Sequence, residues 1–132
     1  MDLAYARSCR APYEAVIGAV ERVAASHGFD VLERRDLQAM LAAKGFAIAP
    51  LTIFEVGPGR SLVEWRDLPD AIVRCRLAVS ASDDGVRIGA LRPAALCDAL
   101  LRGPVQGLIE DLDAAVAALV DDIAANAGSS ST

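Results

Sequence analysis

Apolar residues near the C-terminus recur with the spacing of a single helix face. They are Val105, Leu108, Ile109, Leu112, Val116, Leu119, Val120 and Ile123. The acidic residues of the same segment fall mostly on the opposite face, at Glu110, Asp111, Asp113, Asp121 and Asp122. A helix with one apolar face is stable when another element covers that face. This segment therefore predicts a long surface helix packed on a sheet or on other helices.

The segment Ala71 to Ser80 has the clearest strand pattern in the chain. Its residues alternate between two faces, and the apolar set consists of Val73, Cys75, Leu77 and Val79. Arg74, Arg76 and Ser80 fall on the other face. Residues 82–85, Ser-Asp-Asp-Gly, have turn chemistry, so Val86 to Ala90 is predicted to return as an antiparallel partner.

The first half of the chain is predicted to alternate between strands and helices. Leu3 to Cys9 is the first strand, and a helix with one apolar face runs from Tyr13 to a stop at Gly28. Phe29 to Arg35 is the second strand. Leu51 to Val56, rich in β-branched and aromatic residues, is the third.

A short helix is predicted between the second and third strands. Asp36 can cap its start, and Lys44-Gly45 would end it. The residues that it would bury are Leu37, Met40 and Leu41.

Glycine and proline are expected to interrupt the chain at two further places. Gly57-Pro58-Gly59 is predicted to break the third strand, with a short helix over Arg60 to Arg66 after it. Pro93 is predicted to open a helix that carries Cys97. The fold that covers all these apolar faces is α+β: a mostly antiparallel sheet packed on one face by helices. We expect a single domain over residues 1–127 and a disordered tail over 128–132.

The charge of the chain limits its partners. The net charge is −5, from 18 acidic against 13 basic residues. An acidic surface repels phosphate backbones and anionic lipid headgroups, so neither a nucleic acid nor a membrane is expected as a partner. No uninterrupted apolar stretch approaches the length of a membrane span.

The cysteines indicate a reduced protein without a metal. Cys9, Cys75 and Cys97 are odd in number and far apart, with no CxxC pattern. We therefore expect no disulfide framework, no structural metal, no cofactor and a cytoplasmic location.

Several segments together resemble the domain of unknown function 302 family. They are residues 28–32 with the short helix after Asp36, the strand Leu51 to Val56 with its break at Pro58, residues 72–79 and 85–88, and the C-terminal helix. The resemblance covers roughly residues 8 to 125. It implies a compact α+β domain, commonly dimeric, with no activity attached to the family as a whole.

The chain departs from this family at its most distinctive place. The family often has Cys-Asn-Pro after the third strand, where this chain has Val56, Gly57 and Pro58. A later Pro-Cys pair of the family corresponds to Arg74 and Cys75. If the two family cysteines act together, this chain has lost one of them, which puts any thiol-based function here in doubt.

Two groups of residues are candidates for binding an anion. Gly57, Gly59, Arg60 and Ser61 lie between a strand and a predicted helix, where free N–H groups and a helix N-terminus can face an anion. Arg74 and Arg76 share a strand face and could grip a carboxylate or phosphate. The alternatives are a tight turn with a capping serine, and solvated arginines paired with Glu55 or Glu64 across the sheet.

Cys75 and His27 are candidates for a thiol function. Cys75 alternates with apolar residues, which favours a buried cysteine that acts as a small hydrophobe. His27 lies in the last turn of the first helix, where a cation interacts well with the helix dipole.

Three functions remain open from the sequence. The first is a homodimeric module that binds a small anionic ligand without catalysis. The second is a thiol-dependent redox protein or enzyme that uses Cys75. The third is a protein interaction module.

Overall fold

The computed structural model describes residues 4–58, 75–83, 85–91 and 106–129. In chain order the elements are β1 (Ala4–Cys9), α1 (Tyr13–Ser26), β2 (Phe29–Asp36), α2 (Leu37–Ala42), β3 (Leu51–Pro58), β4 (Cys75–Ser82), β5 (Gly85–Leu91) and α5 (Gln106–Ser129). The predicted helices over 60–66 and from Pro93, and the first residues of the predicted strand from Ala71, lie outside the described residues.

The five described strands form one antiparallel sheet in the order β1-β5-β4-β3-β2. Strands β2 to β5 are neighbours in the chain and in the sheet. Strand β1 instead pairs with β5 at one edge, so α1 connects β1 to β2 at the opposite edge. The predicted α+β fold with a mostly antiparallel sheet is therefore confirmed.

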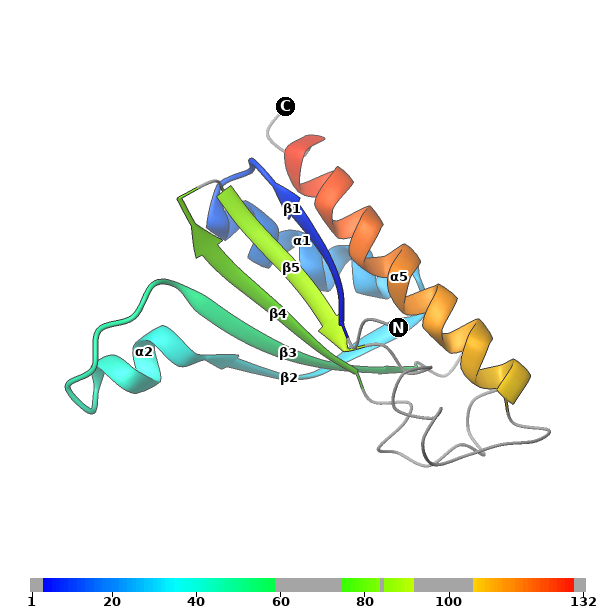
Figure 1. Cartoon of the computed structure of the whole chain (residues 1–132), viewed down its shortest axis with the longest axis horizontal. Coiled ribbons are helices and arrows are strands. Elements are labelled where there is room, and N and C mark those ends of the chain that lie inside the picture. The colour runs from blue at the N-terminus through cyan, green and yellow to red at the C-terminus, as the bar shows by residue number, and fades with distance from the viewer. Residues whose placement is uncertain (1–3, 59–74, 84, 92–105, 130–132) are drawn as a thin grey trace.

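Helices α1 and α5 cover one face of this sheet and pack against each other (Figure 1). The predicted apolar stripe of each helix is buried wherever the structure describes its side chains. On α1 the buried residues are Val16, Ile17, Ala19, Val20, Val23 and Ala24, and on α5 they are Leu112, Val116, Leu119, Val120, Ile123 and Ala127. The sheet contributes a second layer, with Phe29, Phe54, Val56, Cys75, Leu77, Val79, Val86, Ile88 and Ala90. None of the described helices is long and apolar enough to cross a membrane.

The start and the end of α2 follow the prediction. The Asp36 side chain accepts a hydrogen bond from the Ala39 N–H at 3.0 Å, as an N-cap does. At the other end Gly45 takes a φ of +89°. The N–H of Phe46 bonds to the carbonyl of Leu41 at 2.9 Å and that of Gly45 to Ala42 at 3.0 Å. These two bonds form a Schellman motif, which ends the helix at the predicted place.

The predicted burial of Leu37, Met40 and Leu41 in α2 was wrong. This helix has no buried residue, and 49% of Met40 is exposed. The physical reason is its position: α2 contacts β3 and projects past the end of the sheet, where the described chain offers no apolar layer to cover it (Figure 1).

The predicted break after Val56 was also wrong for Gly57 and Pro58. Both continue β3, where Gly57 pairs with Asp30 and Pro58 with Phe29. Proline is tolerated at a strand end because the missing N–H removes only a terminal ladder bond. At the C-terminus, α5 runs to Ser129, two residues into the predicted tail.

Candidate functional site

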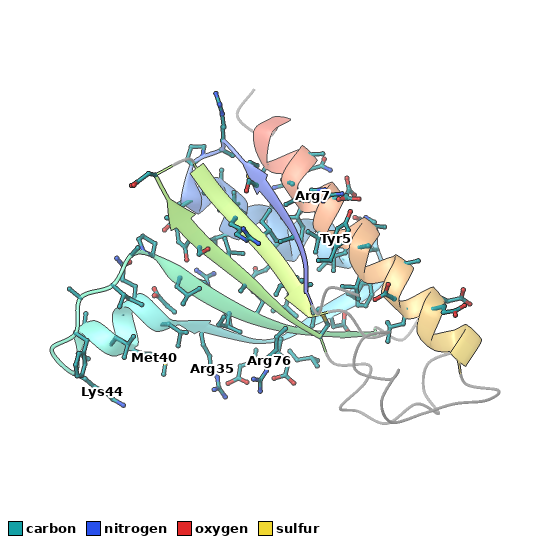
Figure 2. The ribbon with its side chains drawn as sticks, in the orientation of Figure 1. Tyr5, Arg7, Arg35, Met40, Lys44 and Arg76 are labelled. Carbon is teal, nitrogen blue, oxygen red and sulfur yellow. The ribbon has the colours of Figure 1, made fainter. Side chains whose placement is uncertain are left out.

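The sheet face opposite α1 and α5, here called the open face, carries a row of charged side chains. Glu33 on β2, Glu55 on β3 and Arg76 on β4 are successive register partners. The next row contains Arg35 and Ile53 and continues over small residues on β4, β5 and β1, namely Ala78, Gly89 and Ala6. Figure 2 shows Arg35 and Arg76 extending from this face, away from the two helices.

A β-bulge at Leu32 places two of these charges on the open face. Val31 pairs with Val56, and the next paired residue is Glu33, which lies opposite Glu55. In an unbroken strand Val31 and Glu33 would share a face. The extra residue reverses the alternation, so Val31 faces the core while Glu33 and Arg35 face away from it.

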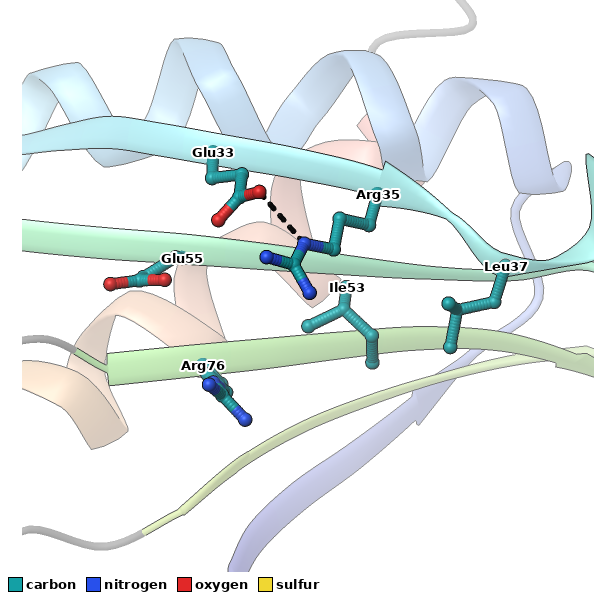
Figure 3. A pocket seen from close by; sticks show the side chains of 6 residues that line it. All are labelled: Glu33, Arg35, Leu37, Ile53, Glu55 and Arg76. Atoms are coloured by element: carbon teal, nitrogen blue, oxygen red, sulfur yellow. Dashed lines mark hydrogen bonds and ion pairs between the residues drawn. The ribbon is translucent and has the colours of Figure 1, made fainter. Parts of the chain in front are cut away.

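These side chains line a pocket of about 200 Å³ on the open face (Figure 3). Its walls come from three neighbouring strands and the first residue of α2. The lining residues are Glu33, Arg35, Leu37, Ile53, Glu55 and Arg76. The pocket thus combines two carboxylates and two guanidinium groups with two apolar side chains.

The charges of the pocket support one another. The Nε of Arg35 donates to Glu33 Oε1 at 2.7 Å. This hydrogen bond lowers the pKa of Glu33, and the positive charge of Arg76 adds to the effect. The pKa of Arg35 is raised by the same bond to Glu33 and by the charge of Glu55. Both shifts favour the ionised forms of Glu33 and Arg35. The formal charges of the two carboxylates and two guanidinium groups that line the pocket sum to zero.

Only part of the predicted anion site lies among the described residues. Arg76 lines the pocket, opposite Glu55 as the strand pattern suggested. Gly57 is buried within β3 and pairs with β2. Gly59, Arg60, Ser61 and Arg74 lie outside the described residues, as does Glu64.

The sequence reasoning missed most of the pocket. Glu55 was named only as a partner of Arg76 across the sheet. Ile53 could have been found, because it alternates with the buried Phe54 on β3. Glu33 and Arg35 could not, because their face depends on the bulge at Leu32.

Cys75 is a buried core residue, as its alternation with apolar residues indicates. Burial raises the pKa of its thiol to about 12, and the negative charge of Asp113 acts in the same direction. A reactive thiolate needs a cation nearby and some access to solvent. Cys75 is instead buried, and the charge that acts on its thiol is the negative charge of Asp113.

His27 caps the C-terminal end of α1 and contacts α5. Its Nε2 lies 2.8 Å from Asp122 Oδ2. The side-chain amide of Asn126 donates to the same aspartate, both to its carboxylate and to its backbone carbonyl. The sequence predicted that His27 lies at the end of a helix. It did not predict the contact with Asp122, because no local sequence pattern links these two residues.

A second polar cluster joins β1 to α5 (Figure 2). The Tyr5 hydroxyl donates to both carboxylate oxygens of Asp121, at 2.9 and 3.0 Å, and this bonding raises the pKa of Tyr5. Arg7 donates to the Tyr5 hydroxyl at 2.6 Å and lies 3.0 Å from Asp121. Tyr5, Arg7 and Asp121 thus find their hydrogen-bond and ionic partners within the cluster. Because Tyr5 and Arg7 lie on β1 and Asp121 on α5, these contacts attach α5 to the sheet edge. Among the described residues, no group of three or more His, Cys, Asp or Glu side chains could hold a metal ion.

Fold and site define a small α+β domain with one helix-covered sheet face and one open face that bears a mixed-charge pocket. The chain belongs to the family described as domain of unknown function DUF302, whose sequence pattern matches residues 5–125. The resemblance noted from the sequence is thereby confirmed.

The same fold is seen in a solved structure of this family. The chain is similar to an uncharacterized conserved DUF302 protein from Bacillus stearothermophilus, with a TM-score of 0.80 and 20% sequence identity. The match covers 93% of this chain and 99% of that one. No curated protein matches the chain.

Proposed function

We propose that this chain is a homodimeric domain that binds a small polar ligand in the pocket on the open face. The observation that carries the proposal is the convergence of Arg35, Arg76, Glu33 and Glu55 above Leu37 and Ile53. Small-molecule sites typically combine apolar walls with a few convergent polar groups. The proposal does not include catalysis.

Arg76 is the proposed anchor for an anionic group of the ligand. A guanidinium group binds a carboxylate or phosphate through parallel hydrogen bonds. Arg35 already donates to Glu33, so it is less available for this role. Because the formal charges of the pocket sum to zero, it suits a ligand with one anionic group and a hydrogen-bond donor better than a multiply charged anion. Small organic acids with an amino or hydroxyl group fit this description.

A function based on Cys75 has less support. With a thiol pKa of about 12, almost no thiolate exists at neutral pH. We therefore propose the binding function ahead of the redox alternative, and we propose neither a nucleic acid nor a membrane as partner of this acidic chain.

Thermal-shift measurements followed by calorimetry test the ligand proposal. The panel contains inorganic phosphate, acetate and small amino and hydroxy acids, each with the full chain. Arg76→Ala is expected to abolish the response to the best ligand. Arg87→Ala is the matched control, because Arg87 is an exposed arginine on the same face that does not line the pocket. The absence of any response in the panel, or an equal loss in both variants, would count against the proposal.

A further inference from the structure

The segment 37–48, here called the α2 arm, exposes apolar side chains. Met40 is 49% and Phe46 62% exposed. Leu37 and Leu41 are half-buried. Helix α2 lies past the end of the sheet (Figure 1), so the exposed side chains of Met40 and Phe46 belong to that end of the molecule. An exposed apolar surface usually marks a contact with another molecule.

The α2 arm is held in a defined shape. Asp36 caps its helix, and the Schellman motif around Gly45 fixes the path of Phe46. The side-chain amide of Gln38 donates to the carbonyl of Ile48 at 3.2 Å, which closes the loop back onto the helix. An arm whose conformation is already fixed loses little conformational freedom when it docks, which favours binding.

The charges of the open face indicate what would dock there. The pocket residues contribute two acids and two bases, arranged in adjacent rows of the sheet. In a two-fold arrangement a surface meets itself, so a face with both signs can pair its arginines with the glutamates of another copy. Many acids of the chain lie on α5, on the opposite side of the sheet, and do not oppose this approach.

We propose that the open face is the contact surface between two copies of this chain, with the α2 arm of each copy lying over the open face of the other. The inference rests on the homodimer of the proposed function and specifies its interface. Leu37 belongs both to the arm and to the pocket wall, so arm and pocket form one continuous surface. The arm of the second copy therefore closes the pocket, and each ligand site is completed by apolar residues of the other subunit.

This arrangement couples ligand binding to association. A ligand that binds only the closed pocket stabilises the dimer by mass action. The ligand found for the pocket should then lower the dissociation constant of the dimer.

The experiment compares two double variants of the full chain by sedimentation over a range of concentrations and by native mass spectrometry. Met40→Glu with Phe46→Glu places charge on the arm. Ala25→Glu with Ala118→Glu is the matched control, because both alanines are exposed on the helices of the other face. We expect the arm variant to dimerise about tenfold more weakly or worse, and the control to equal the unmodified chain. Circular dichroism confirms that each variant is folded.

A charge variant tests the same surface independently of the arm. Glu55→Arg should weaken the dimer, and Glu55→Arg combined with Arg76→Glu should restore it. An unmodified chain that stays monomeric throughout, or an arm variant that dimerises as well as the control, overturns the inference.

The two proposals can fail separately. A monomeric chain that binds a panel ligand through Arg76 refutes the interface and leaves the ligand proposal standing. A dimer that is broken by the arm variant but binds nothing in the panel supports the interface and refutes the ligand proposal.

Discussion

The hydroxyl oxygens of Tyr13 on α1 and Thr52 on β3 lie 2.6 Å apart and share a hydrogen bond. Thr52 is buried, and it is the one polar side chain in the buried set of the described residues. The bond therefore satisfies a polar group inside an otherwise apolar layer between helix and sheet. Burial also raises the pKa of Tyr13, so its hydroxyl keeps its proton near neutral pH.

Tyr13→Phe should lower the free energy of unfolding by about 1–3 kcal/mol, because it leaves the Thr52 hydroxyl buried without this partner. Thr52→Val should cost less, because Tyr13 is only half-buried whereas Thr52 is buried. Urea denaturation of both single variants and the double variant gives the coupling energy. Additive effects of the two substitutions would show that the bond contributes nothing.

The thiol of Cys75 should make the protein less stable at alkaline pH. In the unfolded chain the thiol ionises near its ordinary pKa of 9.0, whereas in the fold its pKa is about 12. Between these values the unfolded state loses a proton that the folded state keeps, so stability falls as pH rises. The slope for this one group is about 1.4 kcal/mol per pH unit. Denaturation of the chain and of Cys75→Ala over this range should show a shallower pH dependence in the variant.

The same burial predicts slow alkylation of Cys75 in the native protein. Peptide mapping after iodoacetamide treatment should find Cys9, which is half-buried, modified before Cys75. Rapid modification of Cys75 at neutral pH would revive the thiol hypothesis.

Two glycines with positive φ should respond differently to alanine. Gly45 has a φ of +89°, and an added Cβ would meet nothing within 4 Å, so Gly45→Ala costs backbone strain alone, about 1–2 kcal/mol. Gly85 has a φ of +126°, and its Cβ would collide with the backbone carbonyl oxygen of Cys9. Gly85→Ala should therefore cost clearly more in urea denaturation, because β1 and β5 would have to separate. Equal costs would contradict the described contact.

Deletion of Leu32 should be tolerated. Leu32 is the extra residue of the bulge and is 49% exposed, and without it Glu33 and Arg35 keep their register with β3. Deletion of Ala78 from β4 is the control, because that strand pairs without interruption on both sides. Its loss would move the rest of the strand to the wrong face and should abolish cooperative unfolding, measured by circular dichroism. A Leu32 deletion as damaging as the Ala78 deletion would contradict this account.

The parts of the fold that depend on periodicity could be predicted from the sequence. The buried stripes of α1 and α5 and the alternation around Leu77 follow directly from residue order. The ends of α2 could also be predicted, because Asp36 and Gly45 act locally. The exposure of Met40 could not, because an apolar pattern does not reveal whether a partner element exists to cover it.

Prediction of the candidate site depended more than prediction of the fold on which residues pair across the sheet. Arg76 and Glu55 were readable as residues of one sheet face, since regular strands alternate. The contribution of Glu33 and Arg35 was not readable, because an extra residue in a strand changes which side chains share a face. The contact of His27 with Asp122 joins residues far apart in the chain, and neither residue type specifies the other.

On the outer side of the sheet, the extra residue at Leu32 affects how molecules of this protein can meet. Strand β2 is an edge of the sheet that the described strands form, and an edge strand can offer N–H and C=O groups to a strand from another molecule. A bulge interrupts the even spacing of those groups, so an incoming strand would lose its register partway along. Growth of the sheet from molecule to molecule is thereby discouraged at β2. The protein can have a broad sheet face that neither α1 nor α5 covers without inviting fibre-like assembly along the β2 edge.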